Sequence, residues 1–218
     1  MKEQRCGVPR RGFLQYTVGA AGLVSAGSLF AATPATEDTK INIIGPKTGY
    51  SPQVGTLVSM LTWMRQAVVS STKDLTQTDL DHLFNSRANT IGELMLHLVA
   101  TETYYQMNTF EGIKWDSWSD EIKRKWDPAM NLGEAGRNTI KDHDRDYYLN
   151  ILHETREKSL AEFAKRDDKW LMAIDENWFW GPTNNYCKWF HVCEHESHHS
   201  GQIAFLRKRL PDAPPATE

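Results

Sequence analysis

Residues 186–210 read YCKWFHVCEHESHHSGQIAFLRKRL, and Pro211 follows them. Apolar side chains recur along this stretch at the spacing of one helix face. Proline lacks a backbone N–H and cannot continue a helix. The stretch therefore predicts a long helix from about Tyr186 to Leu210. Its apolar face consists of Val192, Ile203, Leu206 and Leu210.

Four of the protein's eight histidines lie in this predicted helix, at positions 191, 195, 198 and 199. Residues four apart on a helix are separated by about 6 Å along its axis and share a face, so two imidazoles can bind one ion. His195 and His199 fill a gap in the apolar face, where buried imidazoles cost free energy unless their nitrogens find partners. A shared metal ion supplies both partners. We interpret His191 as packing beside the site and His198 as a residue at its rim.

Two ligands are too few for a tight metal site, and His97 is the candidate for the third. It lies among apolar neighbours in a second predicted helix, from Thr90 to about Asn108, where Thr90 and Glu93 form a capping box. A single histidine there is more often a hydrogen-bonded core residue. The H-x-x-x-H pattern elsewhere in the chain reverses that preference. Three further histidines, in polar surroundings, are interpreted as surface residues: His82, His143 and His153.

Two more segments show apolar residues at helical spacing, from Pro52 to about Ser71 and from about Arg145 to Lys165. Four long amphipathic helices and few alternating β-branched runs predict an all-α chain built as a four-helix bundle. We expect this domain to span residues 52–210. An extended lead-in over residues 36–51 precedes it, and a disordered tail over residues 211–218 follows.

The first 35 residues differ from the rest. A basic stretch ends in Arg10 and Arg11, and a modestly apolar run rich in Gly and Ala follows, from Phe13 to Ala32. This order is typical of a cleaved export signal. The run RRGFLQ resembles a twin-arginine signal, with Pro9 where Ser or Thr is usual. A permanent membrane helix needs about 20 more strongly apolar residues. We therefore expect a periplasmic or otherwise extracytoplasmic protein without a membrane span after cleavage, and an uncleaved anchor is the alternative.

The charge of the chain argues against a nucleic-acid partner. The formal net charge is −3, and no basic run follows residue 40. Proteins that bind nucleic acid usually carry a clustered basic face. Export would in addition separate the protein from nucleic acid.

The two histidine segments carry a resemblance to a known family. Residues 90–102, TIGELMLHLVATE, and residues 189–203, WFHVCEHESHHSGQI, resemble the DinB/YfiT-like metalloenzyme family, and the similarity covers about residues 52–210. The resemblance implies an up-down-down-up four-helix bundle in which His97, His195 and His199 bind a divalent metal ion. One departure is Ser200, because the family commonly has Arg after the last histidine. Ser200 cannot make the contact that this Arg would make, such as one to an acidic ligand group.

Three histidine ligands leave coordination positions open, as in a site for water or substrate. Zinc is the first expectation for the metal, and nickel, iron and manganese are alternatives, since imidazole suits several of these ions. The resemblance implies metal-dependent chemistry on a small molecule, by a hydrolase or a thiol transferase. Relatives often dimerise, so a homodimer is among the assemblies it implies.

The catalytic base is less clear from the sequence. Four carboxylates near the histidines are candidates, and each can equally be a helix cap or a surface charge: Glu93, Glu102, Glu194 and Glu196. Glu93 ranks first because it lies four residues before His97.

Two other interpretations of the protein stay open. One is a non-catalytic metal- or ligand-binding protein of the cell envelope, with a pocket roofed by the tryptophan-rich stretches, and the other is buried histidines without a metal. The tryptophans concerned are Trp115, Trp118, Trp126, Trp178 and Trp180.

Overall fold

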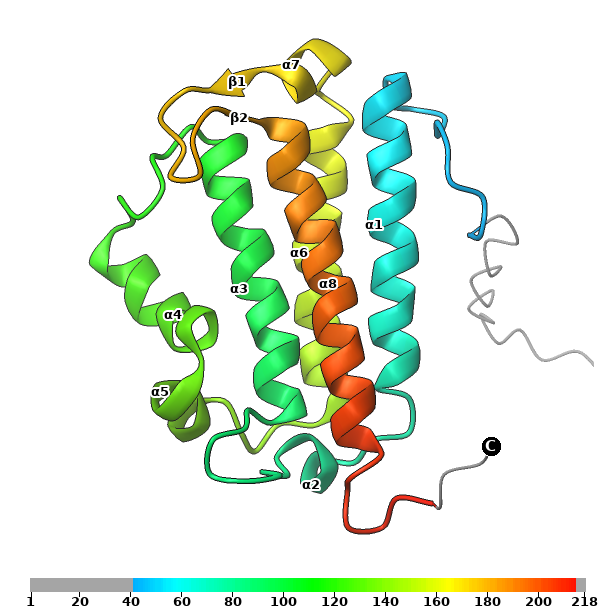
Figure 1. Ribbon diagram of the computed structural model, residues 1–218, viewed down its shortest axis with the longest axis vertical. Helices are drawn as coiled ribbons and strands as arrows, with labels where there is room; N and C mark the ends of the chain where they lie inside the picture. Colours follow the sequence, from blue (N-terminus) through cyan, green and yellow to red (C-terminus); the bar gives the residue numbers. More distant parts are fainter. Residues whose placement is uncertain (1–40, 215–218) are drawn as a thin grey trace, which may run out of the picture. The chain divides into compact units, whose positions relative to one another are not determined.

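Four long helices lie side by side in the computed structural model, which describes residues 41–214 (Figure 1). They are α1 (Pro52–Ser71), α3 (Ile91–Thr109), α6 (Arg145–Phe163) and α8 (Asn185–Arg207). The prediction of an all-α, mostly helical chain is confirmed for these residues. The predicted export signal, residues 1–35, lies outside the described range.

Short elements connect the long helices. They are α2 (Gln77–Leu80), α4 (Asp120–Asn131), α5 (Gly133–Thr139), α7 (Asp168–Met172), β1 (Ile174–Asp175) and β2 (Thr183–Asn184). The two strands form a small antiparallel pair, with Ile174 opposite Asn184. No helix within residues 41–214 is both long enough and apolar enough to cross a membrane.

The long helices begin where local sequence signals place them. The side chain of Thr90 accepts a hydrogen bond from the Glu93 N–H, and the Glu93 carboxylate accepts one from the Thr90 N–H at 2.7 Å. This reciprocal pair is the predicted capping box. Helix α8 ends at Arg207, slightly earlier than expected, because the chain tightens into a turn in which the Arg209 N–H donates to the Leu206 carbonyl.

Contacts between helix ends establish the helix directions. Arg207, at the end of α8, donates to the carbonyl of Ser71 at the end of α1, so these two helices run the same way. The indole of Trp189, near the start of α8, donates to Thr109 at the end of α3, so α3 and α8 run in opposite directions. Figure 1 shows α3 and α6 both running from the end with α2 and α5 to the end with the strands.

A layer of buried charge divides the core between these helices. Each long helix contributes one residue to it: Arg65, Glu102, Arg156 and Glu196. The Arg156 guanidinium lies 2.8 Å from a Glu102 oxygen and 3.0 Å from a Glu196 oxygen, and Arg65 pairs with both carboxylates. Both carboxylates are buried, so the interpretation of Glu102 and Glu196 as caps or surface charges was wrong. Charges this deeply buried persist only when they are paired.

Apolar clusters fill the bundle on both sides of this layer. One cluster, toward α2, includes Leu94, Leu98, Leu152 and Ile203. The other, toward the strands, includes Leu57, Tyr105, Phe163 and Trp189. The three predicted metal-ligating histidines project from α3 and α8 between these regions, so the site is held by helices that the core packs firmly.

Candidate metal centre

The structure brings the three predicted imidazoles together. His97 projects from α3, and His195 and His199 project from consecutive turns of α8. The Nε2 atom of His195 lies 2.8 Å from Nε2 of His97 and 3.1 Å from Nε2 of His199. One ring nitrogen from each residue lies within 4.8 Å of the others. Three nitrogens from two facing helices thus point at a single place.

The opposite nitrogens of two of these rings are held by oxygen atoms. Nδ1 of His97 lies 2.9 Å from the carbonyl oxygen of Ala129, which α4 supplies. Nδ1 of His199 lies 2.7 Å from Oε1 of Gln202, one turn further along α8. Both oxygens only accept hydrogen bonds, so each Nδ1 carries the ring proton. The Nε2 atoms of both rings therefore present lone pairs to the centre.

The three imidazoles of this site have lowered pKa values. Burial first, and then the neighbouring histidines, lower the pKa of His195 to about 3. Burial and then His97 lower the pKa of His199 to about 4, and burial lowers the pKa of His97. All three rings are therefore neutral at pH 7, and of the three inward nitrogens only that of His195 can carry a proton. A divalent cation would satisfy all three lone pairs, so these residues fit a metal ion and could hold one.

Gln202 is the residue that sequence reasoning missed at this centre. We expect Gln202→Ala to weaken zinc affinity about tenfold, the lower end of the effect of removing a hydrogen-bond partner of a ligand, because Gln202 is exposed and water can partly replace it. Competition with a chromophoric chelator measures this change. Gln77→Ala, on the exposed surface of α2, is the matched control. Equal zinc affinity in the Gln202 variant and the control would show that Gln202 does not orient His199.

The other predicted residues lie apart from this convergence. His198 is exposed at the rim, as expected, and contacts the amide of Gln202 at 3.1 Å. His191 is half-buried, and its Nδ1 lies 2.9 Å from the hydroxyl of Tyr105. The two groups of residues that could hold a metal within residues 41–214 do not include His82, His143 or His153.

Glu93 is held in the helix cap. One carboxylate oxygen accepts from the Thr90 N–H, and no hydrogen bond within residues 41–214 joins Glu93 to the three histidines. Burial raises the pKa of Glu93, against the hydrogen bonds from Thr90, which lower it. Among the other candidate bases, Glu102 and Glu196 are tied up in the charged layer. Glu194 is exposed, and its oxygen lies 3.6 Å from Nε2 of His191.

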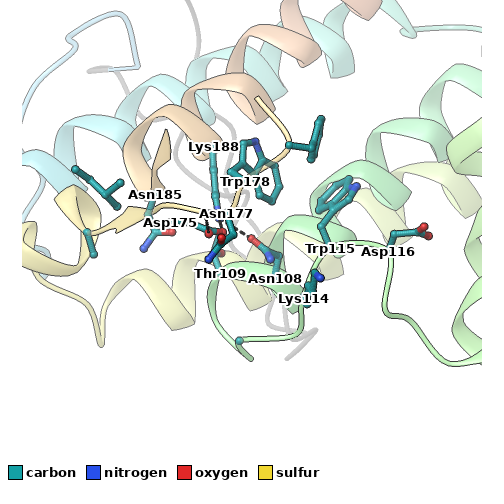
Figure 2. A pocket seen from close by; sticks show the side chains of 14 residues that line it. Asn108, Thr109, Lys114, Trp115, Asp116, Asp175, Asn177, Trp178, Asn185 and Lys188 are labelled. Carbon is teal, nitrogen blue, oxygen red and sulfur yellow. Dashed lines mark hydrogen bonds and ion pairs between the residues drawn. The ribbon is translucent and has the colours of Figure 1, made fainter. Parts of the chain in front are cut away.

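A separate cavity of about 1030 Å³ opens at the strand end of the bundle. Figure 2 shows Lys188, Asp175 and Asn108 meeting on one side of it. The buried ammonium of Lys188 lies 2.8 Å from Asp175, 2.9 Å from Asn108 and 4.0 Å from the centre of the Trp178 ring. No histidine lines this cavity among the described residues.

The tryptophans that were expected to line a pocket lie in three different environments. Trp115 and Trp178 line the cavity. Trp118 is buried against Tyr104, and Trp126 packs against the core. Trp180 is exposed and lies beside His191, with ring centres 5.0 Å apart. Only part of the tryptophan-rich sequence therefore contributes to a pocket.

Comparison with known proteins identifies a family and a fold. A family model described as mycothiol-S-transferase matches residues 56–211, which contain all three histidines. The chain is similar to the crystal structure of a conserved protein from Enterococcus faecalis, with 14% identity, a TM-score of 0.53, and coverage of 70% of this chain and 94% of that chain. A protein from Streptococcus pneumoniae gives 14% identity, a TM-score of 0.56, and coverage of 72% and 91%. These structural likenesses show the fold alone. No curated protein matches the sequence.

Proposed function

Since the chain belongs to the mycothiol-S-transferase family, we propose that it is a metal-dependent enzyme that transfers a small-molecule thiol, through its sulfur atom, to an electrophilic acceptor. The proposed centre is formed by His97, His195 and His199. The observation that carries the proposal is that three neutral imidazoles converge on one point. Of their three inward nitrogens, only that of His195 can carry a proton, so the others have lone pairs without a hydrogen-bond donor. A hydrolase acting at the same centre is the alternative reaction.

The chain's own residues prepare this centre. Ala129 and Gln202 hold the outer nitrogens of His97 and His199, which keeps the inner lone pairs aimed at one point. Three protein ligands leave positions open for a sulfur or oxygen atom. When bound there, a divalent ion supplies Lewis acidity, which lowers the pKa of a coordinated thiol or water. Zinc is the ion we propose first, with nickel, iron and manganese as alternatives.

We also propose a helix topology, a location and a set of partners, on the basis of the family and the sequence. The helix directions support an up-down-down-up bundle over residues 52–210. The extracytoplasmic location rests on residues 1–35. We expect a small-molecule substrate, no nucleic-acid partner, and a homodimer as one candidate assembly.

A non-catalytic binding protein is the second candidate, and the cavity at the strand end favours it. Its volume suits a small ligand, and its wall combines aromatic rings with fixed polar groups. Lys188 donates to Asn108 and Asp175 and lies over the Trp178 ring, so its positive charge is held in one place at the cavity wall. In this case the histidines would hold a metal without turning over a substrate.

Chelation distinguishes the two candidates. We expect the purified protein to transfer a low-molecular-weight thiol to an electrophilic acceptor, to lose this activity completely on chelation, and to regain it when zinc is restored. Thiol conjugates, esters and amides are assayed in parallel to detect hydrolysis. Activity that survives chelation would contradict the proposal. Saturable thiol binding by the zinc-loaded protein without turnover of any of these compounds would favour the binding protein.

A further inference from the structure

We infer that α8 carries a second divalent-cation site, formed by His191, Glu194 and His195, which shares the His195 imidazole with the three-histidine centre. The sharing rests on the proposed function, because it requires a metal at that centre. The second site itself depends only on residues of one helix.

The spacing of the three residues places them on one face of α8. Residues 191–195 read HVCEH, so Glu194 and His195 follow His191 by three and four positions and lie over the next turn. Nε2 of His191 lies 3.6 Å from a Glu194 oxygen, and one ligand atom from each of the three residues lies within 4.8 Å of the others. Bonds of about 2.0–2.2 Å to zinc require shorter separations. The Glu194 side chain, which is 47% exposed, can rotate toward an ion, and the two half-buried histidine rings must shift with it.

His195 has a second ring nitrogen that takes no part in the three-histidine centre. Its Nε2 faces His97 and His199, whereas its Nδ1 makes no hydrogen bond within residues 41–214. The corresponding Nδ1 atoms of His97 and His199 are both occupied. The two nitrogens of an imidazole point in diverging directions, so one ring can contact two ions. When both are bound, the ring proton of His195 leaves to solvent.

The Nδ1 atom of His191 has a hydrogen-bond partner, as do those of His97 and His199, but this partner is a hydroxyl that can either donate or accept. Nδ1 of His191 lies 2.9 Å from the hydroxyl oxygen of Tyr105. Burial raises the pKa of Tyr105, so this phenol stays protonated, and its oxygen can accept the Nδ1 proton of His191. Nε2 of His191 then presents its lone pair to Glu194. Partners of this kind fix the ring orientation and tautomer of metal-binding histidines.

The surroundings make the second site accessible and electrostatically favourable. The exposed Trp180 ring packs against His191 with ring centres 5.0 Å apart, while Glu194 faces solvent. A single carboxylate with two neutral imidazoles gives the site a net negative charge, which attracts a cation. Two histidines and one carboxylate leave several coordination positions open and suit zinc or iron. An ion held there could bind an acidic group of a substrate at an open coordination position.

Zinc stoichiometry tests the inference. Metal-free protein is dialysed to equilibrium against zinc, and bound metal and protein are both quantified. We expect two zinc ions per chain in the wild type and one in Glu194→Gln, which removes the charge at nearly constant volume. The matched control is Glu157→Gln, because Glu157 forms an exposed pair with His153 on α6 at a distance of 3.9 Å. This control should keep both ions.

The outcomes separate this inference from the proposed function. One ion in the wild type, or the same count in Glu194→Gln as in the wild type, would overturn the second site and leave the proposed function intact. His97→Ala should lose only the ion of the three-histidine centre. If His97→Ala keeps both ions, the three-histidine centre is contradicted and the second site is not. Paramagnetic resonance of the protein loaded with two copper(II) ions should show magnetic coupling through the His195 ring. Two uncoupled copper spectra would overturn the sharing of His195.

Discussion

His195→Ala is expected to abolish tight zinc binding and all metal-dependent turnover. The His195 Nε2 atom is the central one of the three, 2.8 Å and 3.1 Å from its neighbours. Its removal leaves His97 and His199 as two ligands from different helices, too few for a tight site. A ligand that binds only the folded protein stabilises it by about 2.7 kcal/mol at a concentration 100 times its dissociation constant. The wild type should gain stability of this order from zinc, and the variant none.

Thermal unfolding with and without zinc, together with metal analysis, measures this difference. In the absence of metal the variant should fold normally, since the substitution removes a ring that is only partly buried and contacts other histidines rather than the apolar core. His153→Ala changes an exposed histidine of α6 and should behave as the wild type. If His195→Ala keeps the zinc affinity and the turnover of the wild type, the three-histidine centre is not where the protein acts.

Glu102→Gln should destabilise the fold by about 3–5 kcal/mol at pH 7, the range for breaking a buried ion pair from one side. Glu102 is 1% exposed and pairs with Arg156 at 2.8 Å and with Arg65 at 2.8 Å. The glutamine would leave two buried guanidinium groups to share the single carboxylate of Glu196. Burial lowers the pKa of Arg156, because it favours the neutral form. Glu102 and then Glu196 raise this pKa by more, so the net shift is upward. Arg156 keeps its charge in the variant, because an arginine guanidinium is not deprotonated in proteins.

The stability difference should depend on pH. Burial by itself would raise the pKa of Glu102, but Arg156 and then Arg65 outweigh it and lower the pKa from the ordinary 4.5 to about 2. A carboxylate with a lowered pKa stabilises the fold fully above its unfolded-state pKa, and this contribution is lost as the pH falls toward the folded-state value. The gap between wild type and Glu102→Gln should therefore be largest above pH 4.5 and shrink between pH 4.5 and 2.

Urea unfolding at a series of pH values measures both effects. Glu111→Gln is the control, because Glu111 pairs with Lys158 on the surface, where an ion pair contributes about 1 kcal/mol or less. A Glu102 variant as stable as this control at pH 7 would show that the charged layer contributes little to the fold.

The features that the sequence predicts well are local ones. The bounds of α1 and the start of α3 depend on residues within one or two turns, such as the Thr90 and Glu93 capping box. The pairing of His195 with His199 is local too, since the helical period alone puts them on one face. His97 was the candidate third ligand because of its apolar neighbours and the H-x-x-x-H pattern elsewhere in the chain, and the family resemblance implied the same residue. The export signal stays a prediction from residues 1–35.

The charged layer could be recognised only in part. Arg156 lies four residues after Leu152 and seven before Phe163, in the middle of the buried stripe of α6. Arg65 occupies a similar position between Leu61 and Val68 in α1. An arginine inside an apolar stripe signals a buried partner. It does not say which carboxylate that partner is, because this depends on how the helices are aligned with one another.

The sequence by itself determined where the helices form and which histidines share a helix face, because both follow from interactions within a few residues. Only the tertiary structure decided what those faces meet. The packing of α3 against α8 sets the distance from His97 to His195, and the placement of α4 brings the Ala129 carbonyl to His97. The same packing buries Glu102 and Glu196 against two arginines. These pairings join residues far apart in the chain, and their geometry depends on the packing of whole helices.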